Sequence, residues 1–298
     1  MENQDFTPFQ SSDDLSHFRN LVRIHLAGEG YSNPVFEDWF VTLDPSIEQK
    51  LGTWNLAQGC AQSSKEDWEG IISSHFEKVF HADSESQEYE SKKGRFEDIK
   101  DQLRLQLYPE NYLDGIDIKE EVVYRTDIPG TLSVLVIDLP SNIVTLRRSD
   151  ANIWNISEDE LFQVALSNTL KSVETEHSVQ DGGEVDLHVI AGEDILSAVS
   201  VFNLKKVKDC VGTHGAIVSI PTRHFIISYP IEDLSVVKAI QAVAVIASGM
   251  NQAGPGSLSP LIYWYKDGVF KNQTYSIEGD KFNFAPDEEF ISVLNLLK

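Results

Sequence analysis

The stretch IVSIPTRHFIISYP, residues 217–230, indicates how this chain folds. Two apolar runs flank the polar group Pro221-Thr222-Arg223-His224. Because proline presets the backbone of a turn and short polar residues complete it, the pattern predicts a strand, a tight turn and a second strand. Such a hairpin favours a sheet with antiparallel or mixed pairing.

The sequence on both sides of this hairpin predicts further strands and helices. Residues 185–192 form an expected strand, residues 193–211 an expected helix that begins acidic and ends basic, and residues 233–250 a long buried helix. Further along, Asp267-Gly268 is a strong signal for a two-residue hairpin turn. The C-terminal part should therefore contain several hairpins.

Two more strands are expected upstream, over residues 120–128 and 131–140, around the turn dipeptide Pro129-Gly130. The run LSVLVID in the second strand is almost entirely apolar, which predicts a strand buried on both faces. Ser157 and Glu160 then match the capping box that begins a helix.

The part before residue 110 predicts mainly helices. One helix opens at Ser12, and residues 65–80 carry a single apolar stripe that is typical of an amphipathic helix. Residues 81–94 are polar and predict a loop, and residues 95–109 predict another helix.

The expected fold class is therefore α+β. Residues 1–110 should form a mainly helical, acidic N-terminal part. Residues 111–298 should form an α+β domain, with a mixed or antiparallel sheet covered by helices.

The composition is that of a globular and strongly acidic protein. The chain has 298 residues, of which 41% are apolar, and its 24 Lys and Arg against 47 Asp and Glu give a formal net charge of −23. Because such a surface repels phosphate groups, it argues against a nucleic-acid partner. It suits a basic protein partner, or it serves only to keep the protein soluble.

Cysteine usage and hydropathy predict the compartment. Cys60 and Cys210 lie far apart and outside any CxxC pair, so we expect neither a disulfide framework nor a structural zinc site, and a reducing cytoplasm. The polar, acidic N-terminus resembles no signal peptide. The longest apolar stretch, residues 236–250, is too short for a bilayer, which takes about 20 residues. We therefore expect a soluble protein without a membrane partner.

Four stretches follow one another in a characteristic order: LSVLVIDLPSNI (132–143), ISEDELFQVALSNTL (156–170), GAIVSIPTRH (215–224) and SLSPLIYWYKDGVF (257–270). In that order they resemble the YtpQ-like family of uncharacterised bacterial proteins, a domain-of-unknown-function family, mainly over residues 120–275. The resemblance implies a fold more than a function, because the family supplies no activity to transfer. His224 departs from the family's turn, which has Asp there, and GPGS replaces the family's His before Leu-Ser-Pro.

Arg223 and His224 are the first candidate site. Arginine binds carboxylate or phosphate through two parallel hydrogen bonds and histidine titrates near neutral pH, so the pair could bind an anion or serve in acid–base chemistry. The alternative is a simple turn in which Arg223 is solvated. Asp138 ends an expected buried strand, which is a common catalytic position, or it caps the turn that follows.

The remaining polar candidates predict no metal site and no cofactor. His177, His188 and His214 with Cys210 match no zinc spacing, and His188 lies in an apolar strand, where a hydrogen-bonded core histidine is expected. Ser259 lacks the G-x-S-x-G context that exposes a nucleophile.

Three consecutive aromatic residues form a candidate binding surface. Tyr263 and Tyr265 share one face of an expected strand and Trp264 takes the other. An exposed face would supply anchors for a protein interface, and core packing is the alternative.

We therefore expect a cytosolic, non-enzymatic protein that binds another protein, as an inhibitor or immunity-like partner of a basic protein. The alternative is an enzyme of unrecognised type, with Asp138, Arg223 and His224 brought together at one end of the sheet. A third hypothesis is a homodimer formed through an exposed sheet edge or the hairpin over 261–277.

Overall fold

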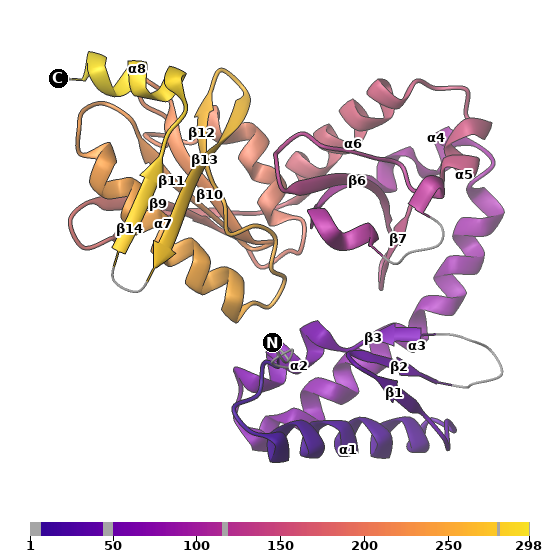
Figure 1. Ribbon diagram of the computed structural model, residues 1–298. Helices are drawn as coiled ribbons and strands as arrows, with labels where there is room; N and C mark the ends of the chain where they lie inside the picture. The colour runs from indigo at the N-terminus through magenta and orange to yellow at the C-terminus, as the bar shows by residue number, and fades with distance from the viewer. Residues whose placement is uncertain (1–6, 44–49, 115–118, 279–280, 298) are drawn as a thin grey trace. The chain divides into compact units, whose positions relative to one another are not determined.

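The computed structural model describes residues 7–43, 50–114, 119–278 and 281–297. The chain divides into two compact units, one of Met1–Ser86 with Ala253–Pro255 and one of Gln87–Gln252 with Gly256–Lys298. Figure 1 shows the helices and strands of both. The division follows residue 86, and not residue 110 as expected, because residues 103–109 form a strand of the second unit. Within the described ranges, every helix is too short or too polar to span a bilayer.

The first unit packs helices against a small antiparallel sheet of order β1-β2-β3. Ser11 caps the first helix by accepting a hydrogen bond from the backbone N–H of Asp14. Phe18 of that helix and Phe76 of the amphipathic helix lie in the core of this unit. The elements are α1 (Ser12–Gly28), β1 (Val35–Glu37), β2 (Phe40–Thr42), β3 (Lys50–Gly52), α2 (Trp54–Ala61), η1 (Lys65–Asp67) and α3 (Trp68–Lys92), which continues into the second unit.

The expected loop over 81–94 is wrong, because α3 continues to Lys92. After Gly70 the segment contains neither proline nor glycine until Gly94, so nothing in it ends the helix. It is also rich in good helix formers. Polar composition alone therefore did not distinguish a loop from a helix.

The second unit holds the remaining elements. They are α4 (Phe96–Ile99), η2 (Lys100–Gln102), β4 (Leu103–Pro109), η3 (Glu110–Leu113), η4 (Lys119–Glu121), β5 (Tyr124–Arg125), β6 (Thr131–Asp138), β7 (Ile143–Thr145), α5 (Arg148–Ile153), α6 (Glu158–Ser172), β8 (Glu176–Asp181), β9 (Asp186–Ala191), η5 (Ser197–Lys206), β10 (Ala216–Thr222), β11 (Phe225–Pro230), α7 (Val236–Ala253), β12 (Ile262–Lys266), β13 (Val269–Glu278), β14 (Lys281–Ala285) and α8 (Glu288–Leu296).

A four-stranded antiparallel sheet has β6 at its centre, with β4, β5 and β7 as its partners. β6 is buried over almost its whole length, as its apolar run predicted. The expected helix over 95–109 is wrong in its second half. Leu103, Leu105 and Leu107 alternate along β4 and enter the same core, which is the two-residue period of a strand. Ser157 caps α6 as predicted.

A seven-stranded antiparallel sheet has the order β14-β13-β12-β10-β11-β9-β8. The hairpin of β10 and β11 at its centre confirms the prediction made from residues 217–230. The turn between β12 and β13 is also confirmed, because Asp267 and Gly268 both have positive φ, 52° and 87°. Every pairing between described strands is antiparallel, and the fold class is α+β.

Both faces of the central strands of the seven-stranded sheet are covered. On one face, Ile217 and Trp264 pack with residues of α7 and α8. On the other, Val218 and Tyr263 share a core with β4, β6, α6 and the 3-10 helix η5. The segment 193–211, expected to be an α-helix, contains the 3-10 helix η5 instead. Residues 197–201 of η5 are all buried, and not only those on one helical face.

Candidate functional site

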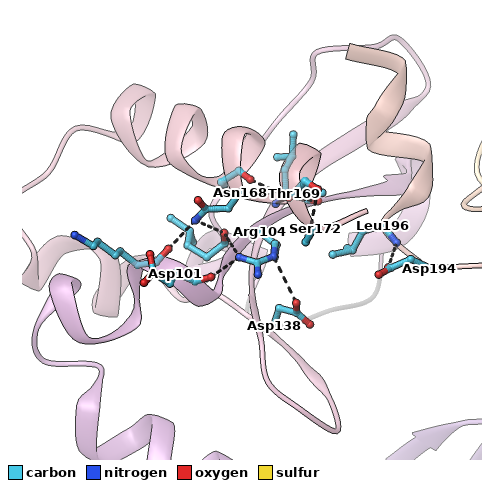
Figure 2. A network of polar contacts seen from close by, with 12 residues as sticks. Asp101, Arg104, Asp138, Asn168, Thr169, Ser172, Asp194 and Leu196 are labelled. Atoms are coloured by element: carbon cyan, nitrogen blue, oxygen red, sulfur yellow. Dashed lines mark hydrogen bonds and ion pairs between the residues drawn. The ribbon is translucent and has the colours of Figure 1, made fainter. Parts of the chain in front are cut away.

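Asp138 and Arg104 form a polar network at one end of the four-stranded sheet (Figure 2). Asp138 is the last residue of β6, and Arg104 lies on the neighbouring strand β4. The Nε atom of Arg104 is 3.5 Å from Oδ2 of Asp138, and its Nη1 donates hydrogen bonds to the carbonyl oxygens of Asp101 and Leu103. The sequence indicated Asp138 but not this cationic partner, because the two residues meet only when β4 is a strand.

The carboxyl group of Asp138 is half-buried and perturbed. Burial raises the pKa of Asp138 above its ordinary value and repulsion from Asp194 raises it further, whereas Arg104 opposes the shift. Asp194 itself accepts a hydrogen bond of 2.8 Å from the backbone N–H of Leu196 (Figure 2). A desolvated carboxyl group close to a second carboxylate is common at functional sites.

The end of α6 is fastened to β4 beside this network. Thr169 Oγ1 accepts a hydrogen bond of 2.8 Å from the backbone N–H of Leu105. Asn168 Nδ2 donates to the carbonyl oxygen of Leu103 at 3.1 Å. Figure 2 shows both residues facing β4. These bonds hold the C-terminal part of α6 against β4.

A surface pocket of about 710 Å³ lies where α6 leads into β8 and β9 ends. Four exposed acidic residues line it, Glu174, Glu176, Glu193 and Asp194, together with Phe225. The described lining includes no lysine or arginine. We call this site the acidic pocket, because the charged residues of its described lining are all acidic and come from two segments of the chain.

Gly192 lines the acidic pocket at a position where no side chain fits. A Cβ atom there would lie 2.3 Å from Oγ of Ser197 and 2.8 Å from the carbonyl oxygen of Glu174. The backbone N–H of Gly192 donates to the carbonyl oxygen of His224 at 3.1 Å, and its own carbonyl oxygen is 3.1 Å from Nδ1 of His224. His224 therefore lies beside the pocket and fastens the hairpin turn to it.

Arg223 is packed into the protein. The simple-turn interpretation expected it to be solvated, and this expectation is wrong. Its backbone N–H donates to the carbonyl oxygen of Gly256 at 2.8 Å. Gly256 has φ +75°, and a Cβ atom there would lie 2.5 Å from Nε of Arg223. Burial lowers the pKa of Arg223, against the influence of Tyr108 and Tyr112. Its Nε atom is buried without a hydrogen-bond partner in the described part of the chain.

The three residues of the expected catalytic alternative have different neighbours. Asp138 pairs with Arg104, Arg223 packs on Gly256, and His224 contacts Gly192. Among the described residues, no hydrogen bond or ion pair joins Asp138 to Arg223 or to His224. The catalytic alternative therefore stays a prediction without a shared contact.

The aromatic strand does not offer an exposed surface. Tyr263, Trp264 and Tyr265 are 0%, 2% and 3% exposed, which corrects the expectation that they anchor a partner. The hydroxyl of Tyr263 donates to the carbonyl oxygen of Pro129 at 2.8 Å, and Nε1 of Trp264 donates to that of His214 at 3.0 Å. They alternate between two faces as predicted, but both faces of their strand β12 are covered.

His177, His188 and Cys210 come together at the edge of the seven-stranded sheet. His177 on β8 stands opposite Ile190 and His188 on β9 stands opposite Val179, so both imidazoles lie on one face. The Nε2 atom of His177 is 2.9 Å from Nδ1 of His188 and 3.6 Å from Sγ of Cys210. The three potential ligand atoms all lie within 4.8 Å of one another. Sequence spacing missed this cluster because its members come from two strands and a distant turn.

Two members of this His–His–Cys cluster, His188 and Cys210, are partly desolvated, whereas His177 is exposed. Burial lowers the pKa of His188, with a further contribution from His177. Burial raises the pKa of the Cys210 thiol to about 11, and Asp209 adds to the shift. A thiol with so high a pKa is a poor nucleophile at neutral pH. His214, considered with these residues from the sequence, does not belong to the cluster within the described ranges.

Comparisons of the chain with family models, with curated proteins and with solved structures find no match. The resemblance to the YtpQ-like family therefore stays a prediction.

Proposed function

We propose that this protein binds a basic, extended segment of another protein at the acidic pocket and the adjoining edge of β8. The observation that carries the proposal is the pocket itself. It is about 710 Å³ in volume, its described charged residues are all acidic, and it opens beside a strand whose outer edge has no partner strand among those described.

Charge supports a cationic ligand over an anionic one. The whole chain carries a formal charge of −23, and Glu174, Glu176, Glu193 and Asp194 concentrate negative charge at one concave place. A lysine or arginine side chain in the pocket would meet these carboxylates, and the surrounding field would steer a basic protein towards them.

The edge strand supplies a second mode of contact. All six residues of β8 are exposed, and β8 is the last strand of the seven-stranded sheet. An open strand edge presents backbone N–H and C=O groups that can pair with an extended segment of another chain. Because Glu176 is both the first residue of β8 and part of the pocket wall, such a segment would pass directly beside the pocket.

Binding of this kind suits the role expected from the composition, an inhibitor or immunity-like partner of a basic protein. The acidic surface would cover basic residues that the partner needs for its own function, and the strand pairing would add specificity. The proposal requires neither catalysis nor a membrane.

The proposal can be tested with a short synthetic peptide of alternating lysine and valine, measured by fluorescence anisotropy at low and at high salt. We expect binding that weakens as salt rises. The double variant Glu174→Gln/Glu193→Gln should bind about 2- to 30-fold more weakly, as expected for two exposed ion pairs. The variant Glu66→Gln/Glu69→Gln, which makes the same charge change at exposed residues of the first unit, should bind as the wild type does.

A second peptide separates the strand edge from charge alone. N-methylation of alternate peptide groups keeps every lysine but removes backbone donors, so this peptide should bind more weakly than the unmodified one. Equal losses in the pocket variant and in the first-unit variant would contradict the proposal. So would a stable homodimer in light scattering whose contacts occupy the β8 edge, because a second copy would then be the partner.

A further inference from the structure

The His–His–Cys cluster has the donor set of a transition-metal site. Two imidazole nitrogens and one thiolate sulfur are ligands that Zn²⁺ prefers, and hard cations such as Mg²⁺ and Ca²⁺ prefer oxygen. His177, His188 and Cys210 supply these atoms from β8, β9 and the turn after η5. None of them lines the acidic pocket, and the donor set is a separate observation, although His177 also lies on the strand β8 that the proposed function uses.

Two of the three donor separations lie near those of tetrahedral coordination, and the third is at most 4.8 Å. With Zn–N of about 2.05 Å and Zn–S of about 2.3 Å, tetrahedral ligands place nitrogen and sulfur about 3.6 Å apart and two nitrogens about 3.3 Å apart. The observed separation of His177 Nε2 and Cys210 Sγ is 3.6 Å. The two histidine nitrogens are 2.9 Å apart and form a hydrogen bond. An increase of about 0.4 Å between these nitrogens would admit the ion, which side-chain rotation can supply.

The protein holds two of the donors on paired strands and ties the third to them by a hydrogen bond. His177 and His188 lie on paired strands, and the register of β8 and β9 fixes them on one face. Ser228 on β11 stands opposite His188, and its hydroxyl donates a hydrogen bond of 2.7 Å to the carbonyl oxygen of Cys210. The turn that carries the thiol is therefore tied to the strand beside His188. Such supporting contacts are what a metal site needs to keep its geometry.

We propose that His177, His188 and Cys210 bind one Zn²⁺ ion with three protein ligands. The thiol proton of Cys210 leaves to solvent when the sulfur ligates the ion. A tetrahedral ion with three protein ligands keeps a fourth position for water or a ligand, and the exposed side of His177 gives that position access to solvent. The site is thus an open one and not a closed structural one.

Cobalt(II) is the probe that tests the site, because it replaces zinc and is coloured. Titration of the protein with Co²⁺ should give visible absorption typical of tetrahedral cobalt and a near-ultraviolet sulfur-to-cobalt charge-transfer band, both saturating at a single ion per chain. Zn²⁺ added afterwards should abolish both. Loss of a direct ligand should weaken binding by roughly 100-fold or more, so His177→Ala should lose the spectrum. His177 is exposed, and its removal should leave the circular dichroism unchanged.

His214→Ala is the matched control, since this histidine lies in the same unit but outside the cluster. It should bind Co²⁺ as the wild type does. Cys210→Ser should lose the charge-transfer band specifically, provided that circular dichroism shows it folded. The proposal is overturned if the wild type gives no charge-transfer band, or if His177→Ala and the wild type titrate alike.

Discussion

Ser228 donates a hydrogen bond of 2.7 Å from its hydroxyl to the carbonyl oxygen of Cys210. Both residues are buried, and Ser228 stands opposite His188 in the pairing of β11 with β9. One hydroxyl group therefore links the turn that carries the thiol to the strand pair that carries the imidazoles. Cys210 lies in a turn after η5 and not in a strand, so this bond holds it in place where backbone hydrogen bonds of a β-sheet would hold a strand residue.

Ser228→Ala should therefore affect both stability and metal affinity. Loss of a buried hydrogen bond should lower the free energy of unfolding by about 1 kcal/mol, measured by urea denaturation. A freer Cys210 should weaken Co²⁺ binding about 10-fold or more, as loss of outer contacts does in metal sites. Ser219→Ala is the control, because Ser219 is also buried and donates to the carbonyl oxygen of Leu261 at 2.8 Å, not to a residue of the cluster. A similar loss of Co²⁺ affinity in both variants would show that the bond from Ser228 has no special role.

Trp264→Ala should destabilise the fold strongly. Trp264 is buried between the sheet and α8, where its ring centroid lies 5.4 Å from that of Phe290. Truncation of a buried tryptophan costs roughly 3–5 kcal/mol in the free energy of unfolding. Val269→Ala, at an exposed position of the same hairpin, should cost less than about 0.5 kcal/mol. Urea denaturation would measure the free energy of unfolding of both variants. Equally small losses would show that the aromatic strand is exposed and not buried.

The centre of the fold could be predicted from local pattern because its signals are local. The hairpin of 217–230, the Asp267-Gly268 turn and the Ser157 cap each depend on neighbouring residues only. The errors arose where one pattern fits two structures. The composition of LRLQLYP fits the end of a helix, although its leucines alternate as in a strand, and the polar run over 81–94 fits a loop, although it continues a helix.

The candidate sites were harder to predict, because they are built by contacts between distant segments. Arg104 and Asp138 are 34 positions apart and meet through the pairing of β4 with β6. His177 and Cys210 are 33 positions apart and meet through a sheet edge and a turn. No spacing rule describes such a cluster. The burial of the aromatic strand likewise depends on α7 and α8, which cover the second face of its sheet.

Gly192→Ala should disturb the acidic pocket. An added Cβ would lie 2.8 Å from the backbone oxygen of Glu174, which cannot move without shifting the start of β8. Overpacking of this kind should lower the free energy of unfolding by about 1–3 kcal/mol. The matched substitution Gly249→Ala in α7, where a Cβ meets nothing within 4 Å, should raise it by about 0.5–1 kcal/mol. Thermal or urea unfolding should show a less stable Gly192→Ala variant and a more stable Gly249→Ala variant. A stabilising Gly192→Ala substitution would contradict the tight packing around Gly192.

Asp138→Asn should change the pH dependence of stability in a direction set by burial. Folding raises the pKa of Asp138, so the folded state holds its proton more tightly than the unfolded state does, and ionisation destabilises the fold as the pH rises above about 4. The asparagine variant lacks this loss.

Urea unfolding from about pH 3 to about pH 7 should therefore show the stability of Asp138→Asn rising relative to that of the wild type. Asp267→Asn gives the opposite control. Lys205 lowers the pKa of Asp267 by a hydrogen bond, so the ionised carboxylate favours the folded state and the variant should lose ground as the pH rises. The two variants could instead show the same change of stability with pH. The attraction of Arg104 would then outweigh the burial of Asp138, and the carboxylate of Asp138 would be an ordinary ion-pair partner.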